Sequence, residues 1–148
     1  QRQMCIRDSS QAMRSREIHR TYQAFALGET AASGTIDAPI ARLNGSLIQR
    51  TVDFASGERS VTHYRTLAHC SVFSHLELNL ETGRTHQIRV HMAYIGHPLL
   101  GDTLYNKTPG TFPRQALHSA SLSFVHPITG EPLNFHAPLP EDMQNLLT

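Results

Sequence analysis

The stretch V-F-S-H-L-E-L-N-L-E-T-G-R-T-H-Q-I-R-V-H-M-A-Y-I-G-H-P, residues 72–98, carries the clearest structural signals in the chain. In its first part, Leu76, Leu78 and Leu80 alternate with polar residues. A period of two is typical of a strand with one buried face. The pattern therefore predicts a strand over residues 72–80.

The second part of the same stretch predicts a helix. Thr85 is suited to the N-cap, Gly96 to the position just past the last turn, and Pro98 to the stop beyond it. One apolar stripe suited to face a core is formed by three residues of this segment: Ile88, Met92 and Ile95.

The remaining segments are mostly strand-like. Strands are predicted over residues 21–27, 117–125 and 133–135, and two more strand-like runs flank a turn at Ser56 and Gly57. Turn signals predict an irregular stretch over residues 33–40, and short helices are expected over residues 13–18 and 141–147. Strands with helices at intervals favour an α+β domain with a mixed, largely antiparallel β-sheet and flanking helices.

The composition fits one globular domain of 148 residues, 39% of them hydrophobic and 17% charged. No apolar run approaches the roughly 20 residues that span a bilayer. Cys5 and Cys70 give no disulfide framework, so we expect a cytoplasmic protein. Every basic residue except Lys107 is Arg, which suits recognition of phosphate and base edges, although a GC-rich genome explains the same bias.

Other chemistries find little support in the sequence. Ten histidines suggest a test for metal binding, but His86 and His91 lie on different faces of the predicted helix with no carboxylate between them. This spacing does not match known zinc motifs, so no metal is expected. The chain has no G-x-S-x-G elbow and no glycine-rich phosphate loop, so a serine hydrolase and a nucleotide cofactor are both unsupported.

The most distinctive motif is L-N-L-E-T-G-R-T-H-Q-I-R-V-H-M-A-Y-I-G-H-P-L-L-G-D-T-L-Y, residues 78–105. Four shorter motifs accompany it: R-T-Y-Q-A at 20–24, G-T-I-D-A-P-I at 34–40, R-Q-A-L-H-S-A at 114–120 and F-V-H-P-I-T-G-E at 124–131. Together they resemble the RluA-type RNA pseudouridine synthases, which act on the large ribosomal subunit. The resemblance implies that residues 11–148 are the C-terminal part of a catalytic domain. Residues 1–10 are interpreted as a non-native leader.

This resemblance implies an isomerase that converts uridine to pseudouridine without a cofactor or a metal. Its partner would be RNA, most often ribosomal RNA and in some relatives transfer RNA. Arg89 matches the family arginine that pairs with the catalytic Asp, and Tyr22 matches the tyrosine that lies against the target base. The candidate RNA-binding residues are Arg84, Arg20, His86 and Gln87.

The family places its nucleophilic Asp in an H-R-L-D-x-x-T-S-G segment, and this sequence contains no such segment. We therefore expect a fragment that is inactive alone; the alternative is a non-catalytic RNA-binding domain. Two structural expectations follow. Arg89 and Tyr22 should converge on one cleft, with no carboxylate of this chain paired to Arg89. A truncated sheet should also expose apolar strand surface and an unpaired edge.

Overall fold

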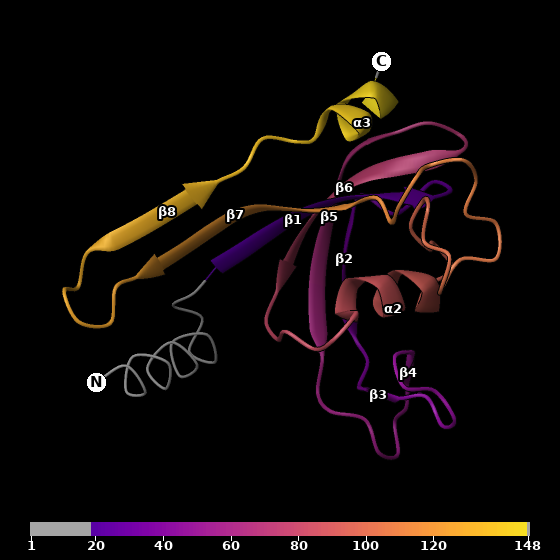
Figure 1. The fold of residues 1–148 in the computed structure, drawn as a ribbon, viewed down its shortest axis with the longest axis horizontal. Helices are drawn as coiled ribbons and strands as arrows, with labels where there is room; N and C mark the ends of the chain where they lie inside the picture. The colour runs from indigo at the N-terminus through magenta and orange to yellow at the C-terminus, as the bar shows by residue number, and fades with distance from the viewer. Residues whose placement is uncertain (1–18, 148) are drawn as a thin grey trace.

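The computed structural model describes residues 19–147. A six-stranded antiparallel sheet, in the order β2-β5-β6-β1-β7-β8, forms its centre, and β3 and β4 form a separate two-stranded sheet (Figure 1). The elements are β1 His19–Leu27, β2 Ser33–Asp37, β3 Ile40–Arg42, β4 Arg50–Val52, β5 Val61–His69, β6 Phe73–Leu80, α2 Gln87–Tyr94, β7 Leu117–Val125, β8 Pro132–His136, α3 Glu141–Gln144 and the 3-10 turn η1 Asn145–Leu147. The predicted α+β class and largely antiparallel sheet are confirmed.

Strand β1 lies inside the sheet and is buried on both faces. Ala24 and Ala26 belong to a core cluster on the face covered by α2, whereas Phe25 packs with Met143 of α3 on the other face. The alternation of side chains along a strand explains this division. The core is therefore split into two parts, one on each side of the sheet.

Helix α2 packs on the sheet through the apolar stripe that the sequence predicts. Ile88 and Met92 are buried against Leu76 and Leu78 of β6, and Ile95 is partly buried beside them. Full burial of side chains of this size contributes roughly 1.5–3 kcal/mol each to folding. This packing fixes the orientation of the helix, and therefore the direction in which its polar side chains leave it.

The helix ends as predicted but begins differently. Gly96 has φ 89, and the N–H groups of Gly96 and His97 donate to the carbonyls of Ala93 and Met92, which is a Schellman motif. At the other end the N-cap is His86, with φ 57 and no side-chain cap bond, so the predicted cap at Thr85 is wrong.

The segments around residues 33–67 depart most from expectation. Residues 33–40, predicted to be irregular, include the edge strand β2, which pairs with β5. The runs flanking Ser56 and Gly57 do not pair with each other: β4 pairs with β3, and β5 joins the main sheet. By contrast, β7 has the predicted bounds, and the C-terminal helix is confirmed as α3 followed by η1. The helix predicted over residues 13–18 lies outside the described residues.

Strands β7 and β8 extend away from the rest of the molecule (Figure 1). Val125, Ile128 and Phe135, on or beside these strands, are at least 46% exposed. Within residues 19–147 the outer strands of the sheet, β2 and β8, each pair on one side only. Exposed apolar surface and free edges are thus present, while their origin in a truncated domain stays a prediction. No helix in this range is long and apolar enough to cross a membrane.

Candidate functional site

Arg89 of α2 is held by a carboxylate that sequence reasoning missed. Its Nε donates to Oδ2 of Asp102 at 2.9 Å, and its Nη2 donates to Oδ1 at 2.9 Å. The Asp102 side chain is fully buried and the Arg89 side chain is only 13% exposed. Oδ1 of Asp102 also accepts hydrogen bonds from the backbone N–H groups of Leu104 and Tyr105. The ion pair is therefore bidentate and anchored to the following loop.

The expectation that no carboxylate of this chain would pair with Arg89 is wrong. The rival possibility, a bridge to Glu77 or Glu81, is also excluded, because Glu77 pairs with Arg65 and Glu81 with Arg59. Asp102 lies within the 78–105 motif, 13 residues after Arg89. One physical argument could have predicted that Arg89 has an acidic partner in the chain: an interior charge without a partner is costly.

Electrostatics keep this pair ionised. Burial, the largest single effect on Asp102, opposes its ionisation. The hydrogen bonds from Arg89 and from the backbone of Tyr105 and Leu104, with the charge of Arg89, outweigh burial and hold the pKa of Asp102 below its usual value. The hydrogen bonds to Asp102 also raise the pKa of Arg89. Arg89 consequently stays a cation with a fixed orientation.

Part of the Arg89 guanidinium is left for another group. Its Nε and Nη2 are used by Asp102, and among residues 19–147 no acceptor is bound to Nη1. The guanidinium carbon lies 5.1 Å from the centroid of the Tyr105 ring, a cation–π contact that further restrains it. An arginine so positioned can bind a second anion through Nη1 without reorienting.

His86 joins the same cluster through Tyr105. The Tyr105 hydroxyl lies 2.8 Å from Nδ1 of His86 and accepts the backbone N–H of Arg50 at 2.8 Å. Burial lowers the pKa of His86, and the charges of Arg89 and Arg50 lower it further. In the bond between Tyr105 and Nδ1 of His86, either group can be the donor, according to the tautomer of the imidazole. The predicted RNA-binding residue His86 is thus held beside Arg89 through its contacts with Tyr105.

Gln87, a predicted RNA-binding residue, is buried and hydrogen-bonded within the chain. It is 2% exposed, and its Nε2 donates to the Val61 carbonyl and to the Thr62 hydroxyl. Its Oε1 accepts hydrogen bonds from the Thr82 hydroxyl and the Arg84 backbone N–H. The amide is saturated within the chain, so this placement argues against a direct contact of Gln87 with RNA. It ties the loop before α2 to strand β5.

Tyr22 lies on the sheet face that carries α2. It is partly buried against the core cluster that includes Ile88 and Met92. Arg20, two residues earlier, is half-buried opposite Leu122 of β7. The polar and ring contacts of Arg89 are made with Asp102 and Tyr105. Convergence of Tyr22 and Arg89 on one cleft therefore stays a prediction.

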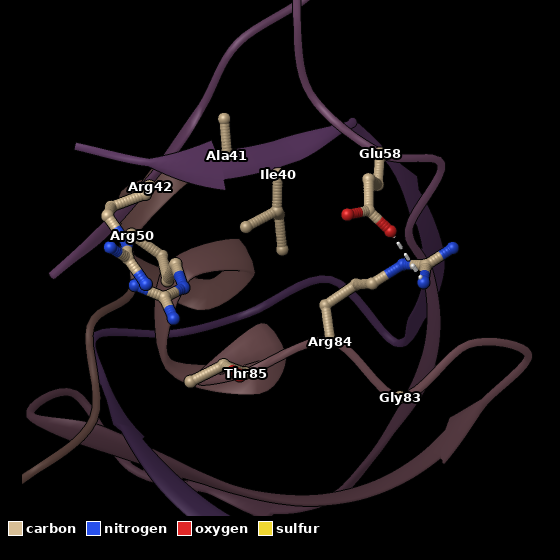
Figure 2. A pocket seen from close by; sticks show the side chains of 8 residues that line it. All are labelled: Ile40, Ala41, Arg42, Arg50, Glu58, Gly83, Arg84 and Thr85. Atoms are coloured by element: carbon tan, nitrogen blue, oxygen red, sulfur yellow. Dashed lines mark ion pairs between the residues drawn. The ribbon is translucent and has the colours of Figure 1, made fainter. Parts of the chain in front are cut away.

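Arg84 lies in a separate open cleft of about 430 Å³, shown in Figure 2. The cleft is lined by Ile40, Ala41, Arg42, Arg50, Glu58, Gly83, Arg84 and Thr85. Nη1 of Arg84 pairs with Oε2 of Glu58 at 2.9 Å, and its Nε donates to the Arg59 carbonyl. Arg84 and Arg89 thus serve different groups, as their separation around the predicted helix suggests.

The histidines of this region are engaged in hydrogen bonds. Buried His91 accepts or donates at Nδ1 with the Thr62 hydroxyl and bonds the Ala38 carbonyl through Nε2. Burial lowers the pKa of His91. Across residues 19–147, no group of at least three His, Cys, Asp or Glu side chains is arranged to hold a metal ion.

Comparisons with known proteins agree with these features. A family described as RNA pseudouridylate synthase matches residues 1–94, a range that includes the segment interpreted above as a leader. An uncharacterized RNA pseudouridine synthase of Bacillus subtilis is 50% identical over 139 residues, which is 93% of this chain and 49% of that protein. The ribosomal large subunit pseudouridine synthase D of Vibrio cholerae is 47% identical over 89% of this chain and 45% of its own length.

Solved structures show the same fold. The human RNA pseudouridylate synthase domain containing 1 matches with a TM-score of 0.74 and 26% identity, over 88% of this chain and 58% of that one. The human RNA pseudouridylate synthase domain containing 4 matches with a TM-score of 0.75 at 21% identity, over 95% of this chain and 65% of that one. The chain spans about half the length of the curated relatives described above.

Proposed function

Because this chain belongs to the RNA pseudouridylate synthase family, we propose that it forms part of a cytoplasmic enzyme that isomerises uridine to pseudouridine in ribosomal RNA. The observation that carries the proposal is the Arg89–Asp102 pair, which fixes a cation and leaves Nη1 for a second carboxylate. The Vibrio cholerae relative is named for the large ribosomal subunit, which favours ribosomal over transfer RNA as the substrate.

The reaction implied by the family needs a nucleophilic carboxylate. An Asp attacks the target uridine, the bond between the sugar and the base nitrogen breaks, and the base rotates. A bond from the sugar to a ring carbon then forms as the bond to the Asp breaks, that carbon loses its proton, and the freed ring nitrogen gains one. In this scheme Arg89 keeps the Asp ionised and oriented. Tyr22 lies against the extracted base, because stacking compensates for the lost stacking in RNA.

Asp102 is a positioning residue in this proposal. It fixes the Arg89 guanidinium through two hydrogen bonds, which leave Nη1 to bind the nucleophilic carboxylate without rotational freedom. Its own carboxylate is fully buried and saturated by four N–H donors. Such a carboxylate is poorly placed to attack a ribose, so the nucleophile must be a different Asp.

A chimera tests the proposal. Residues 19–148 of this chain would replace the matching part of the Bacillus subtilis relative, which is 50% identical. Pseudouridine formation would be followed by tritium release from uridine labelled at the ring carbon that loses its proton. We expect turnover without added metal, a loss of about 100-fold or more in Arg89→Ala, and little change in Arg65→Ala. The 148-residue chain alone should show no turnover.

The outcomes separate the two candidate functions. An active chimera that is insensitive to Arg89→Ala would refute the assigned role of this arginine. A folded chimera that binds RNA but never forms pseudouridine would favour the alternative, a non-catalytic RNA-binding domain.

A further inference from the structure

The cleft of Figure 2 gathers three arginines from three segments. Arg42 ends β3, Arg50 begins β4, and Arg84 lies in the loop before α2. Figure 2 shows Arg42 and Arg50 together on one side of the cleft, and the Arg84–Glu58 pair on the other. The cleft therefore has one cationic wall, formed by Arg42 and Arg50, and one wall formed by an ion pair, with an open space between them.

One of these walls has an unfavourable arrangement in the absence of a ligand. Arg42 and Arg50 are direct register partners in the β3–β4 pair. Like charges directly opposite each other destabilise a sheet. Among residues 19–147 no Asp or Glu pairs with either of them. An anion placed between the two guanidinium groups would remove this repulsion.

On the other wall, the Glu58 carboxylate competes with any anionic ligand for Arg84. The Glu58 backbone is fixed to Ile40 by two hydrogen bonds, and its carboxylate reaches Arg84. The Glu58 side chain is 73% exposed, and exposed ion pairs of this kind contribute little to stability. Arg84 can therefore exchange Glu58 for a phosphate at little cost.

The cleft is linked to the candidate active site. The backbone N–H of Arg50 donates to the Tyr105 hydroxyl, and the Tyr105 ring contacts both His86 and Arg89. A polymer held by Arg50 would thus lie next to the arginine assigned to catalysis. The planar fork of Arg suits phosphate oxygens, which favours RNA over a neutral ligand.

We propose that Arg42, Arg50 and Arg84 form a clamp for the phosphate backbone of the substrate RNA, and that Glu58 occupies Arg84 until RNA arrives. The proposal rests on the function proposed above and identifies where the RNA backbone is held. It also assigns Glu58 a negative role: its carboxylate weakens RNA binding.

The test uses the 148-residue chain and a fluorescent, uridine-containing RNA stem-loop, with anisotropy measured over a range of KCl concentrations. Arg42→Gln and Arg50→Gln should each lower affinity and reduce the slope of log K against log salt by about 0.7–0.9, the value for one lost phosphate contact. Arg42→Lys should retain the slope. Glu58→Gln should tighten binding by up to about fivefold.

The Arg65–Glu77 pair supplies the matched control. It has a similar separation of 3.0 Å and an exposed arginine, but alternation along β5 and β6 places it on the face away from α2. Arg65→Gln and Glu77→Gln should change neither affinity nor slope beyond a small general charge effect. Thermal melts of all variants would confirm folding, and Arg42→Gln should melt no lower than the parent chain.

Each of the following results would overturn the clamp. These are no measurable RNA binding by the parent chain, an unchanged salt slope in both Arg variants, or weaker binding in Glu58→Gln. Equal binding of polyglutamate at the same salt would likewise show a general anion surface. RNA binding with the expected pattern but an inactive chimera would leave the clamp standing and refute only the enzyme.

Discussion

Replacing Asp102 with Ala removes the carboxylate that holds Arg89. The change deletes two charge-assisted hydrogen bonds of 2.9 Å and leaves the N–H groups of Leu104 and Tyr105 without their acceptor. Removing one partner of a buried ion pair costs about 3–5 kcal/mol. Because Arg89 retains 13% exposure, water relieves part of this penalty, so we expect the lower half of that range. The free energy of unfolding would be measured in urea near neutral pH.

Asp142→Ala is the matched control for this experiment. Asp142 pairs with Arg114 at 3.0 Å, but the two side chains are 37% and 40% exposed. An exposed pair contributes about 0–1 kcal/mol, so Asp142→Ala should be nearly neutral. A loss below about 1 kcal/mol for Asp102→Ala, or equal losses in the two variants, would refute the inference that Asp102 is a buried anchor.

Two further predictions concern the loop that carries Asp102. Because the pKa of Asp102 is lower in the folded than in the unfolded chain, its stabilising effect is complete above about pH 5 and is lost as the pH falls through the folded pKa. The difference in unfolding free energy between the parent and Asp102→Asn should therefore shrink in acid. A difference that stays constant with pH would contradict the lowered pKa of Asp102. Gly101 and Gly110 both have positive φ, but a Cβ at Gly101 would overlap the Arg114 carbonyl whereas one at Gly110 meets open space. Gly101→Ala should thus cost several times the roughly 1–2 kcal/mol expected for Gly110→Ala, and equal melting temperatures would argue against this packing.

Local patterns predicted the elements whose burial follows a simple period. The leucines of β6 and the stripe of α2 face the core, as expected from their spacing. Strand β2 was missed because Gly34 and Pro39 resemble loop residues. It forms because β5 offers a pairing edge, and Gly34 lies so close to Tyr64 that a Cβ would be 2.7 Å from its ring.

The site was predicted in part. The motif indicates Arg89 as a site residue. It does not indicate Asp102 as the partner of Arg89, because the loop that carries Asp102 back to α2 follows a path that depends on tertiary contacts. Leu100, beside it, pairs through its N–H with the Phe25 carbonyl on β1. Long-range pairing of this kind leaves no periodic signal in the sequence. The Arg42–Arg50 wall was missed because the sequence did not predict the β3–β4 pairing that makes these two residues neighbours.

Because all hydrogen-bonding positions of the Gln87 amide are occupied, few other residues can replace Gln87. Its two donors and two acceptors join four backbone or hydroxyl groups from β5 and the loop before α2. Glu lacks the donors and Asn is shorter by one methylene. Leu would remove all four hydrogen bonds, although Thr62, Thr82 and Val61 would keep their bonds to His91, the Val61 N–H and the Glu81 N–H. A survey of functional variants would therefore rank position 87 beside Arg89 in intolerance. In this motif, a position that tolerates no substitution need not touch the substrate.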